Sequence, residues 1–141
     1  MPLVRHVRAG AVYAGRVSET QLHRDLVALL ISHIAGSCVV THVAGRPEFP
    51  DPYAIGRHEP DVITEVDDLL IVGEAKIGPD LEEDRAAEQI TDFTAAIGPN
   101  GEKATFWLCV PDEWRDAALD AMAAHGDPHY RTDELGLSLP E

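Results

Sequence analysis

Apolar and polar residues follow helical or strand-like periods along most of this chain. A 3.6-residue period from Ser18 to Gly36 predicts an amphipathic helix, and two apolar alternating runs on either side of Asp67 predict a β-hairpin. The expected elements are a strand or arm over 3–13, a helix over 18–36, a strand over 38–43, hairpin strands over 59–66 and 69–76, a helix over 81–97, a strand over 104–110, a helix over 112–125 and an edge strand around 135–139. Helices that alternate with strands predict one α/β domain with a mixed sheet.

The hairpin brings candidate chemistry together. A turn centred on Asp67-Asp68 pairs Val66 with Leu69, and the same register sets Asp61 opposite Glu74. The two-residue period of a strand then sends Glu74 and Lys76 out of one face. We therefore expect two carboxylates beside an amine. The alternative is an ordinary exposed hairpin, in which opposite charges pair across strands for roughly 0.2–1 kcal/mol.

This arrangement resembles the active site of the PD-(D/E)xK nuclease superfamily. Asp61 matches the motif aspartate, and Glu74 and Lys76 match the acid and the lysine of its triplet. Gln89 resembles the glutamine of the Gln-x-x-x-Tyr element in the RecB-like branch, with Phe93 in place of the tyrosine. The resemblance implies a restriction-endonuclease-like fold, with an α-β-β-β-α-β core over about 18–110, a C-terminal helix over 112–125 and a tail over 126–141.

The resemblance also implies a metal-dependent deoxyribonuclease. Mg²⁺, or Mn²⁺ in its place, would be held by Asp61, Glu74 and the carbonyl of Ala75, with Glu19 of the first helix completing the set. Lys76 would orient or deprotonate the attacking water, and Gln89 would touch that water or the substrate. Glu19 could equally be a first-turn acid that favours the helix dipole, and Gln89 an exposed residue without a role. His23 is expected to be a packing residue rather than a ligand.

Charge bears on the choice of partner. The chain has 11 basic and 25 acidic residues, a net charge of −14, whereas nucleic-acid-binding domains are usually basic. The part through His58 is nevertheless net positive, so Arg5, Arg8, Arg46, Arg57 and His58 are the expected nucleic-acid contacts. Within the Gly/Pro-rich segment 44–58, Phe49 or Tyr53 could stack on a base, although the segment could also be a plain connector.

The remaining features are consistent with a small enzyme or binding module. With 141 residues we expect one domain over 1–141, and the chain has no signal peptide and no apolar run long enough to span a membrane, which predicts a cytoplasmic location. Cys38 and Cys109 are expected to be reduced core residues. DNA is the expected partner, with a homodimer or an assisting protein as further expectations. The competing hypothesis is a catalytically silent copy of the fold that acts as an acidic interaction module or nucleic-acid mimic.

Overall fold

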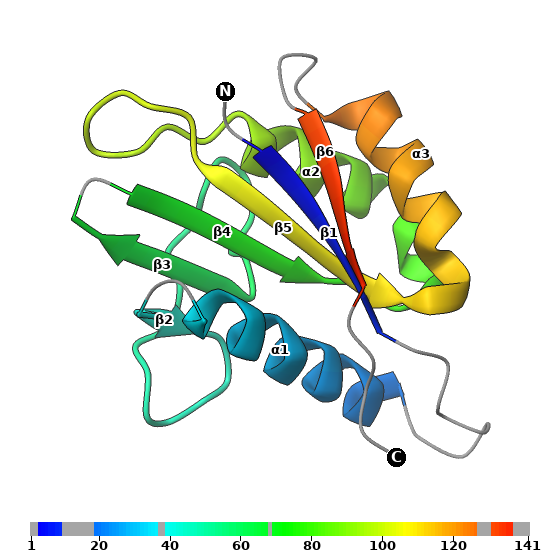
Figure 1. Cartoon of the computed structure of the whole chain (residues 1–141), viewed down its shortest axis with the longest axis horizontal. Helices are drawn as coiled ribbons and strands as arrows, with labels where there is room; N and C mark the ends of the chain where they lie inside the picture. The colour runs from blue at the N-terminus through cyan, green and yellow to red at the C-terminus, as the bar shows by residue number, and fades with distance from the viewer. Residues whose placement is uncertain (1–2, 10–18, 37–38, 68, 127–130, 137–141) are drawn as a thin grey trace.

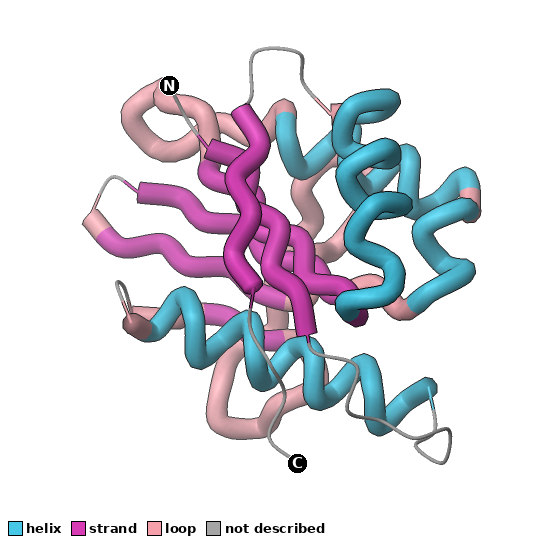
Figure 2. The backbone as a smooth tube through the Cα atoms, turned by 45° about the vertical axis from the view of Figure 1, so that its right-hand side comes forward, coloured by secondary structure: helices cyan, strands magenta, loops and turns pink. Residues whose placement is uncertain are grey.

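A mixed β-sheet lies between one helix on one face and two on the other (Figures 1 and 2). The computed structural model describes residues 3–9, 19–36, 39–67, 69–126 and 131–136, and of 3–9, Glu19 and 131–136 it describes the backbone only. Its elements are β1 (Leu3–Ala9), α1 (Glu19–Ala35), β2 (His42–Val43), β3 (Val62–Val66), β4 (Leu69–Ala75), a 3-10 turn (Gly78–Glu82), α2 (Asp84–Thr94), β5 (Thr105–Pro111), a 3-10 turn (Asp112–Trp114), α3 (Arg115–His125) and β6 (Arg131–Gly136).

The sheet has six strands in the order β2-β3-β4-β5-β1-β6. β2, β3 and β4 form an antiparallel meander, and β4, β5, β1 and β6 run parallel to one another. Parallel strands need both faces covered, and the helices supply this cover. α1 packs on β4 and β5 from one side, while α2 and α3 pack together on the other.

Each sheet face has its own apolar core because the side chains of a strand alternate. Ile71 and Ala75 of β4 face the α1 side, where they meet Leu26 and Leu30. Val72 belongs to the opposite core, with buried residues of α2, α3 and β5. β4 is thus a central strand, and every residue from Leu70 to Ala75 is buried. The expectation that the Glu-x-Lys triplet follows a buried strand is confirmed.

Gly73 lets α1 approach this strand closely. A Cβ atom added to Gly73 would lie 2.8 Å from Cδ2 of Leu30 and 3.3 Å from Cβ of Val62. Real Cβ atoms do not approach other heavy atoms so closely, and Leu30 is fully buried. The absence of a side chain one position before Glu74 therefore sets the distance between α1 and the strand that carries the acid.

Several predicted elements have wrong boundaries, among them the first hairpin strand, which was expected over 59–66 and begins at Val62. The strand expected over 38–43 is only His42–Val43, and Val39 is 70% exposed, while Cys38 lies outside the described residues. The helix expected over 81–97 begins at Asp84 and ends at Thr94, because Pro79 opens a separate 3-10 turn before it. Ile97, expected on the apolar face, is 53% exposed in the following loop. The last helix begins at Arg115, after another 3-10 turn.

The chain ends join the same sheet. β1 lies parallel between β5 and β6, and β6 forms the edge, so the sheet extends beyond the core expected over 18–110. Leu135 lies in β6, whereas Leu137 and Leu139 fall outside the described residues. The order α-β-β-β-α-β expected for 18–110 is present from α1 to β5. The described chain is a single mixed α/β domain, and none of its described helices is long and apolar enough to cross a membrane.

Candidate active site

The hairpin register places Asp61 as the sequence predicts. Val66 pairs with Leu69 and Val62 with Gly73, so Asp61, one residue before β3, comes opposite Glu74 near the end of β4. The Asp61 carboxylate accepts a hydrogen bond from the backbone N–H of Ala75, at 2.9 Å to Oδ2. Its side chain is 16% exposed. The strand end therefore holds a carboxylate in a fixed position with one side open.

Glu74 is buried beside that carboxylate. It is 4% exposed, and its Oε2 has no hydrogen-bond partner. Burial, followed by the negative charge of Asp61, raises the pKa of Glu74 well above its ordinary value. Burial alone would raise the pKa of Asp61 too, but hydrogen bonds with His23 and Glu74 hold it below its ordinary value. One carboxyl group is therefore ionised and its neighbour tends to keep a proton, an arrangement common in functional sites.

Lys76 and Arg85 supply positive charge near Glu74. Lys76 follows β4, and its backbone N–H donates to the carbonyl of Cys109 at 3.0 Å, which fixes it next to β5. Both side chains act to lower the pKa of Glu74, and Lys76 also acts to lower that of His23. Arg85, in the first turn of α2, was missed by the sequence analysis. Arg85 stands among acidic residues at the start of the helix, and nothing in this sequence pattern indicated that it would lie near Glu74.

Gln89 is a buried residue of α2. Its side chain is 3% exposed and its Oε1 has no hydrogen-bond partner. The alternative of an exposed glutamine is therefore wrong. Buried polar atoms without a hydrogen-bond partner are rare in proteins, and they call for an explanation such as a bound ion or water. Glu74 and Gln89 each have one such atom.

His23 is the residue that the sequence analysis undervalued. Its Nε2 lies 3.3 Å from Oδ2 of Asp61, and its side chain is 39% exposed. The hydrogen bond to Asp61 raises the pKa of His23 against the lowering effect of burial. His23 is partly buried, as expected, but it also binds the motif aspartate. Glu19 lies one helical turn earlier, at the start of α1, and its side chain is outside the described residues.

The chemistry of these residues suits a hard divalent cation. Among the side chains that the structure describes, no group of three His, Cys, Asp or Glu is placed to hold a metal ion. Magnesium, however, usually takes one or two protein carboxylates and completes its coordination with water and substrate phosphate. Asp61 and Glu74 meet that requirement, and the unpartnered Oε2 of Glu74 is an available ligand atom. Ala75 follows Glu74 in β4 and is also buried.

The predicted nucleic-acid residues have different surroundings. Arg57 is paired with Asp92, through Nη2 to Oδ1 at 2.9 Å and Nε to Oδ2 at 3.1 Å. His58 Nε2 lies 3.0 Å from Oε1 of Glu88. These contacts fasten the segment 44–58 to α2, so Arg57 and His58 already have acidic partners. Arg5 and Arg8 lie in β1, outside the residues whose side chains are described.

Of the three expected residues whose side chains the structure describes, Arg46 alone borders one of the two carboxylates, that of Asp61. It lines a hollow of about 440 Å³ that also contains Asp61 and His23. Neither proposed stacking residue stands there. Phe49 packs against the core on the α1 side, and the Tyr53 hydroxyl donates to Glu65 at 2.8 Å.

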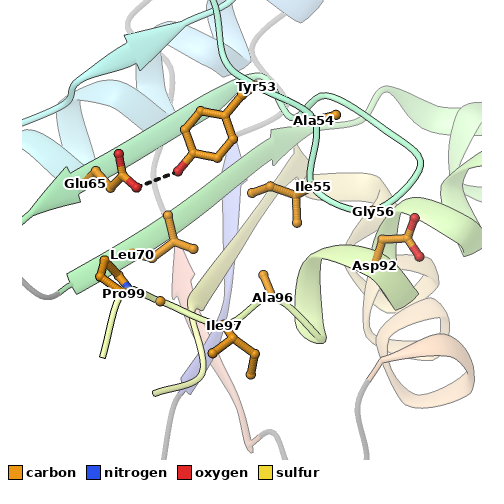
Figure 3. Close-up of a pocket in the computed structure, with 11 residues that line it drawn as sticks. Tyr53, Ala54, Ile55, Gly56, Glu65, Leu70, Asp92, Ala96, Ile97 and Pro99 are labelled. Carbon is orange, nitrogen blue, oxygen red and sulfur yellow. Dashed lines mark hydrogen bonds between the residues drawn. The ribbon is translucent and has the colours of Figure 1, made fainter. Parts of the chain in front are cut away.

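A larger hollow, of about 610 Å³, lies away from these carboxylates (Figure 3). The loop Tyr53 to Gly56, the hairpin residues Glu65 and Leu70 and the segment from Ala96 to Pro99 surround it. Asp61, Glu74 and Lys76 do not line it. The larger hollow therefore lies at the turn end of the hairpin, and the carboxylates lie at its opposite end.

No protein-family model, no curated protein and no solved structure matches this chain. Its function is therefore inferred from the residues of the site themselves.

Proposed function

We propose that this protein is a metal-dependent nuclease of the restriction-endonuclease-like fold, which hydrolyses phosphodiester bonds of DNA with Mg²⁺ or Mn²⁺. The observation that carries the proposal is the pair Asp61 and Glu74 with Lys76 at the end of a buried strand. Burying two acids together is unfavourable without a compensating ligand or proton. A site that binds a cation gives this arrangement a use.

Each residue has a distinct task in the proposed reaction. Asp61 and Glu74 would hold the cation, which when bound would neutralise charge on the phosphate and lower the pKa of a water. Lys76 would orient that water through its ammonium or, in its neutral amine form, accept the proton of the water, and its side chain lies close enough to influence both Glu74 and His23. His23 is a positioning residue, because its contact with Asp61 fixes the direction of that carboxylate. Gln89 would bind water or substrate through its unpartnered Oε1.

The test is cleavage of labelled supercoiled, linear, single-stranded and branched DNA, and of RNA, with Mn²⁺, Mg²⁺ or EDTA. Wild type should cut at least one DNA substrate only with metal. Glu74→Gln and Asp61→Asn should remove both cleavage and calorimetric metal binding, whereas Lys76→Met should remove cleavage and keep metal binding. Gln89→Ala should slow the reaction without abolishing it.

Lys103→Met is the matched control for the lysine, because it removes an equal charge from the loop before β5. It should cleave as wild type does. Wild-type cleavage by Glu74→Gln, in a preparation free of contaminating nuclease, would rule out the proposed site. The cytoplasmic location, the homodimer and the assisting protein partner remain expectations of the same proposal.

The second candidate is a catalytically silent copy of the fold. The net charge of −14 favours it, as do the acidic partners that already bind Arg57 and His58. Such a module should bind divalent cations only weakly and diffusely. A single saturable metal site that Glu74→Gln removes would argue against it.

A further inference from the structure

Two arginines share the hollow that contains Asp61. Arg24 comes from α1 and Arg46 from the segment after β2. The same hollow is lined by Thr20, His23 and Val27 of α1 and by Ala44 and Gly45. The hollow, of about 440 Å³, is within the size range of small-molecule sites, roughly 300–1,000 Å³. Segments that are distant in sequence thus bring two positive charges to the border of the proposed metal site.

These guanidinium groups differ from those of Arg57 and Arg115. Arg57 and Arg115 are each bonded to an aspartate. Arg24 and Arg46 bond to no carboxylate among the described residues, although the chain has 25 acidic residues that could supply one. Unpaired guanidinium groups that face a shared hollow are suited to an anion, since the planar fork of arginine matches phosphate geometry.

The ligand must also tolerate Asp61. The carboxylate of Asp61 is ionised and lines the same hollow, so it would repel a bound phosphate. Two arginines offset that repulsion, and they do so without a metal ion. Among the described residues, no base-stacking aromatic side chain lines this hollow apart from the His23 ring, which is engaged with Asp61. The chemistry therefore favours the backbone of a nucleic-acid strand over its bases.

We propose that Arg24 and Arg46 form a phosphate subsite that binds a backbone phosphate of the substrate strand next to the bond to be cut, independently of sequence. This inference rests on the proposed nuclease function. It names the residues that bind the nucleic-acid strand to a protein whose net charge is otherwise strongly negative. Arg24 thereby joins the expected nucleic-acid contacts, although the sequence did not indicate it, and Arg46 is placed beside Asp61. Arg57 and His58, by contrast, serve to fasten the loop.

The experiment measures binding rather than cleavage. A fluorescein-labelled 12-nucleotide oligodeoxythymidylate is titrated with the full chain in EDTA, and its anisotropy is followed between low and moderate salt. Arg24→Gln and Arg46→Gln should each weaken binding about tenfold, as expected for loss of a charged hydrogen bond. Each should also reduce the salt slope by roughly 0.7, the value for one phosphate contact on a single strand.

Three controls make the result specific. Lys103→Gln removes one positive charge at the opposite end of β4 and should bind as wild type does. A methylphosphonate oligonucleotide, which has the same bases and a neutral backbone, should bind weakly and equally to all variants. An oligonucleotide of different sequence should bind as the oligodeoxythymidylate does.

Wild-type affinity in both arginine variants, or tight binding of the neutral backbone, would overturn the subsite. Failure of the nuclease proposal gives a different result, in which no substrate is cut with any metal while binding still depends on the two arginines. If cleavage occurs, both variants should raise KM and leave kcat close to wild type.

Discussion

His23 and Asp61 are joined across 38 residues by a contact of 3.3 Å between Nε2 and Oδ2. The same Oδ2 accepts the backbone N–H of Ala75 at 2.9 Å. One carboxylate oxygen thus connects helix α1, the start of β3 and the end of β4. The proposed metal site is built around this junction.

The His23–Asp61 pair should show a pH-dependent coupling energy. The folded-state pKa of His23 is raised above 6.5, so the stabilisation is fully present below pH 6.5 and is lost as the pH rises through the folded pKa. A double-mutant cycle with His23→Ala and Asp61→Asn, measured by urea unfolding in EDTA, should give about 0.5–1 kcal/mol at pH 6, a low value because His23 is partly exposed. The coupling should be smaller at pH 9 than at pH 6.

Gln21→Ala provides the matched cycle with Asp61→Asn, because Gln21 is an exposed residue of the same helix. Its coupling should be zero at both pH values. A His23 coupling that did not change with pH would mean that protonation of the ring plays no part in the contact.

Glu74 should destabilise the metal-free protein as the pH rises. Its folded-state pKa is raised, so the folded state keeps a proton that the unfolded state loses. Between the ordinary pKa and the raised one, the free energy of unfolding of wild type should fall relative to that of Glu74→Gln by up to about 1.4 kcal/mol per pH unit. Urea unfolding of both proteins in EDTA from pH 5 to 8 tests this, and a difference that stays constant over that range would contradict it.

Gly73→Ala should destabilise the fold by about 1–3 kcal/mol, the usual effect of overpacking a core. The new methyl group would lie 2.8 Å from Cδ2 of Leu30, so α1 or Leu30 must shift. Gly36→Ala is the control, because its Cβ would meet nothing closer than 3.4 Å. Equal unfolding midpoints for the two variants in urea would show that α1 adapts freely to β4.

Asp92→Ala should loosen the attachment of Arg57 to α2, while the contact between His58 and Glu88 remains. Asp92 accepts the backbone N–H of Arg57 at 2.8 Å as well as the guanidinium, and these bonds lower its pKa. In hydrogen exchange, the Arg57 amide should exchange much faster in this variant, whereas Asp84→Asn, an exposed change on the same helix, should leave it protected. In wild type the protection should persist above the ordinary pKa of an aspartate and be lost as the pH falls through the lowered one.

The sequence by itself determined the local geometry of the site. A strand period of two residues and a turn at Asp67 suffice to set Asp61 opposite Glu74, because both are fixed by backbone geometry within one hairpin. The apolar run of Leu69 to Val72 likewise indicated a buried strand, and β4 is buried from Leu70 onward, although Leu69 is 40% exposed. The helix of α1 was recognisable from its periodicity, with bounds close to those observed.

Only the tertiary structure decided which distant residues join that hairpin. The pairing of His23 with Asp61, of Arg57 with Asp92 and of β1 with β5 depends on how helices and strands pack. Such contacts produce no periodic pattern in the sequence. A histidine or arginine that forms one of them cannot be distinguished, from the sequence, from one that is simply exposed to solvent. Side chains within a hairpin are related by fixed backbone spacing, whereas side chains on separate elements meet only after the sheet order and the faces covered by the helices are set.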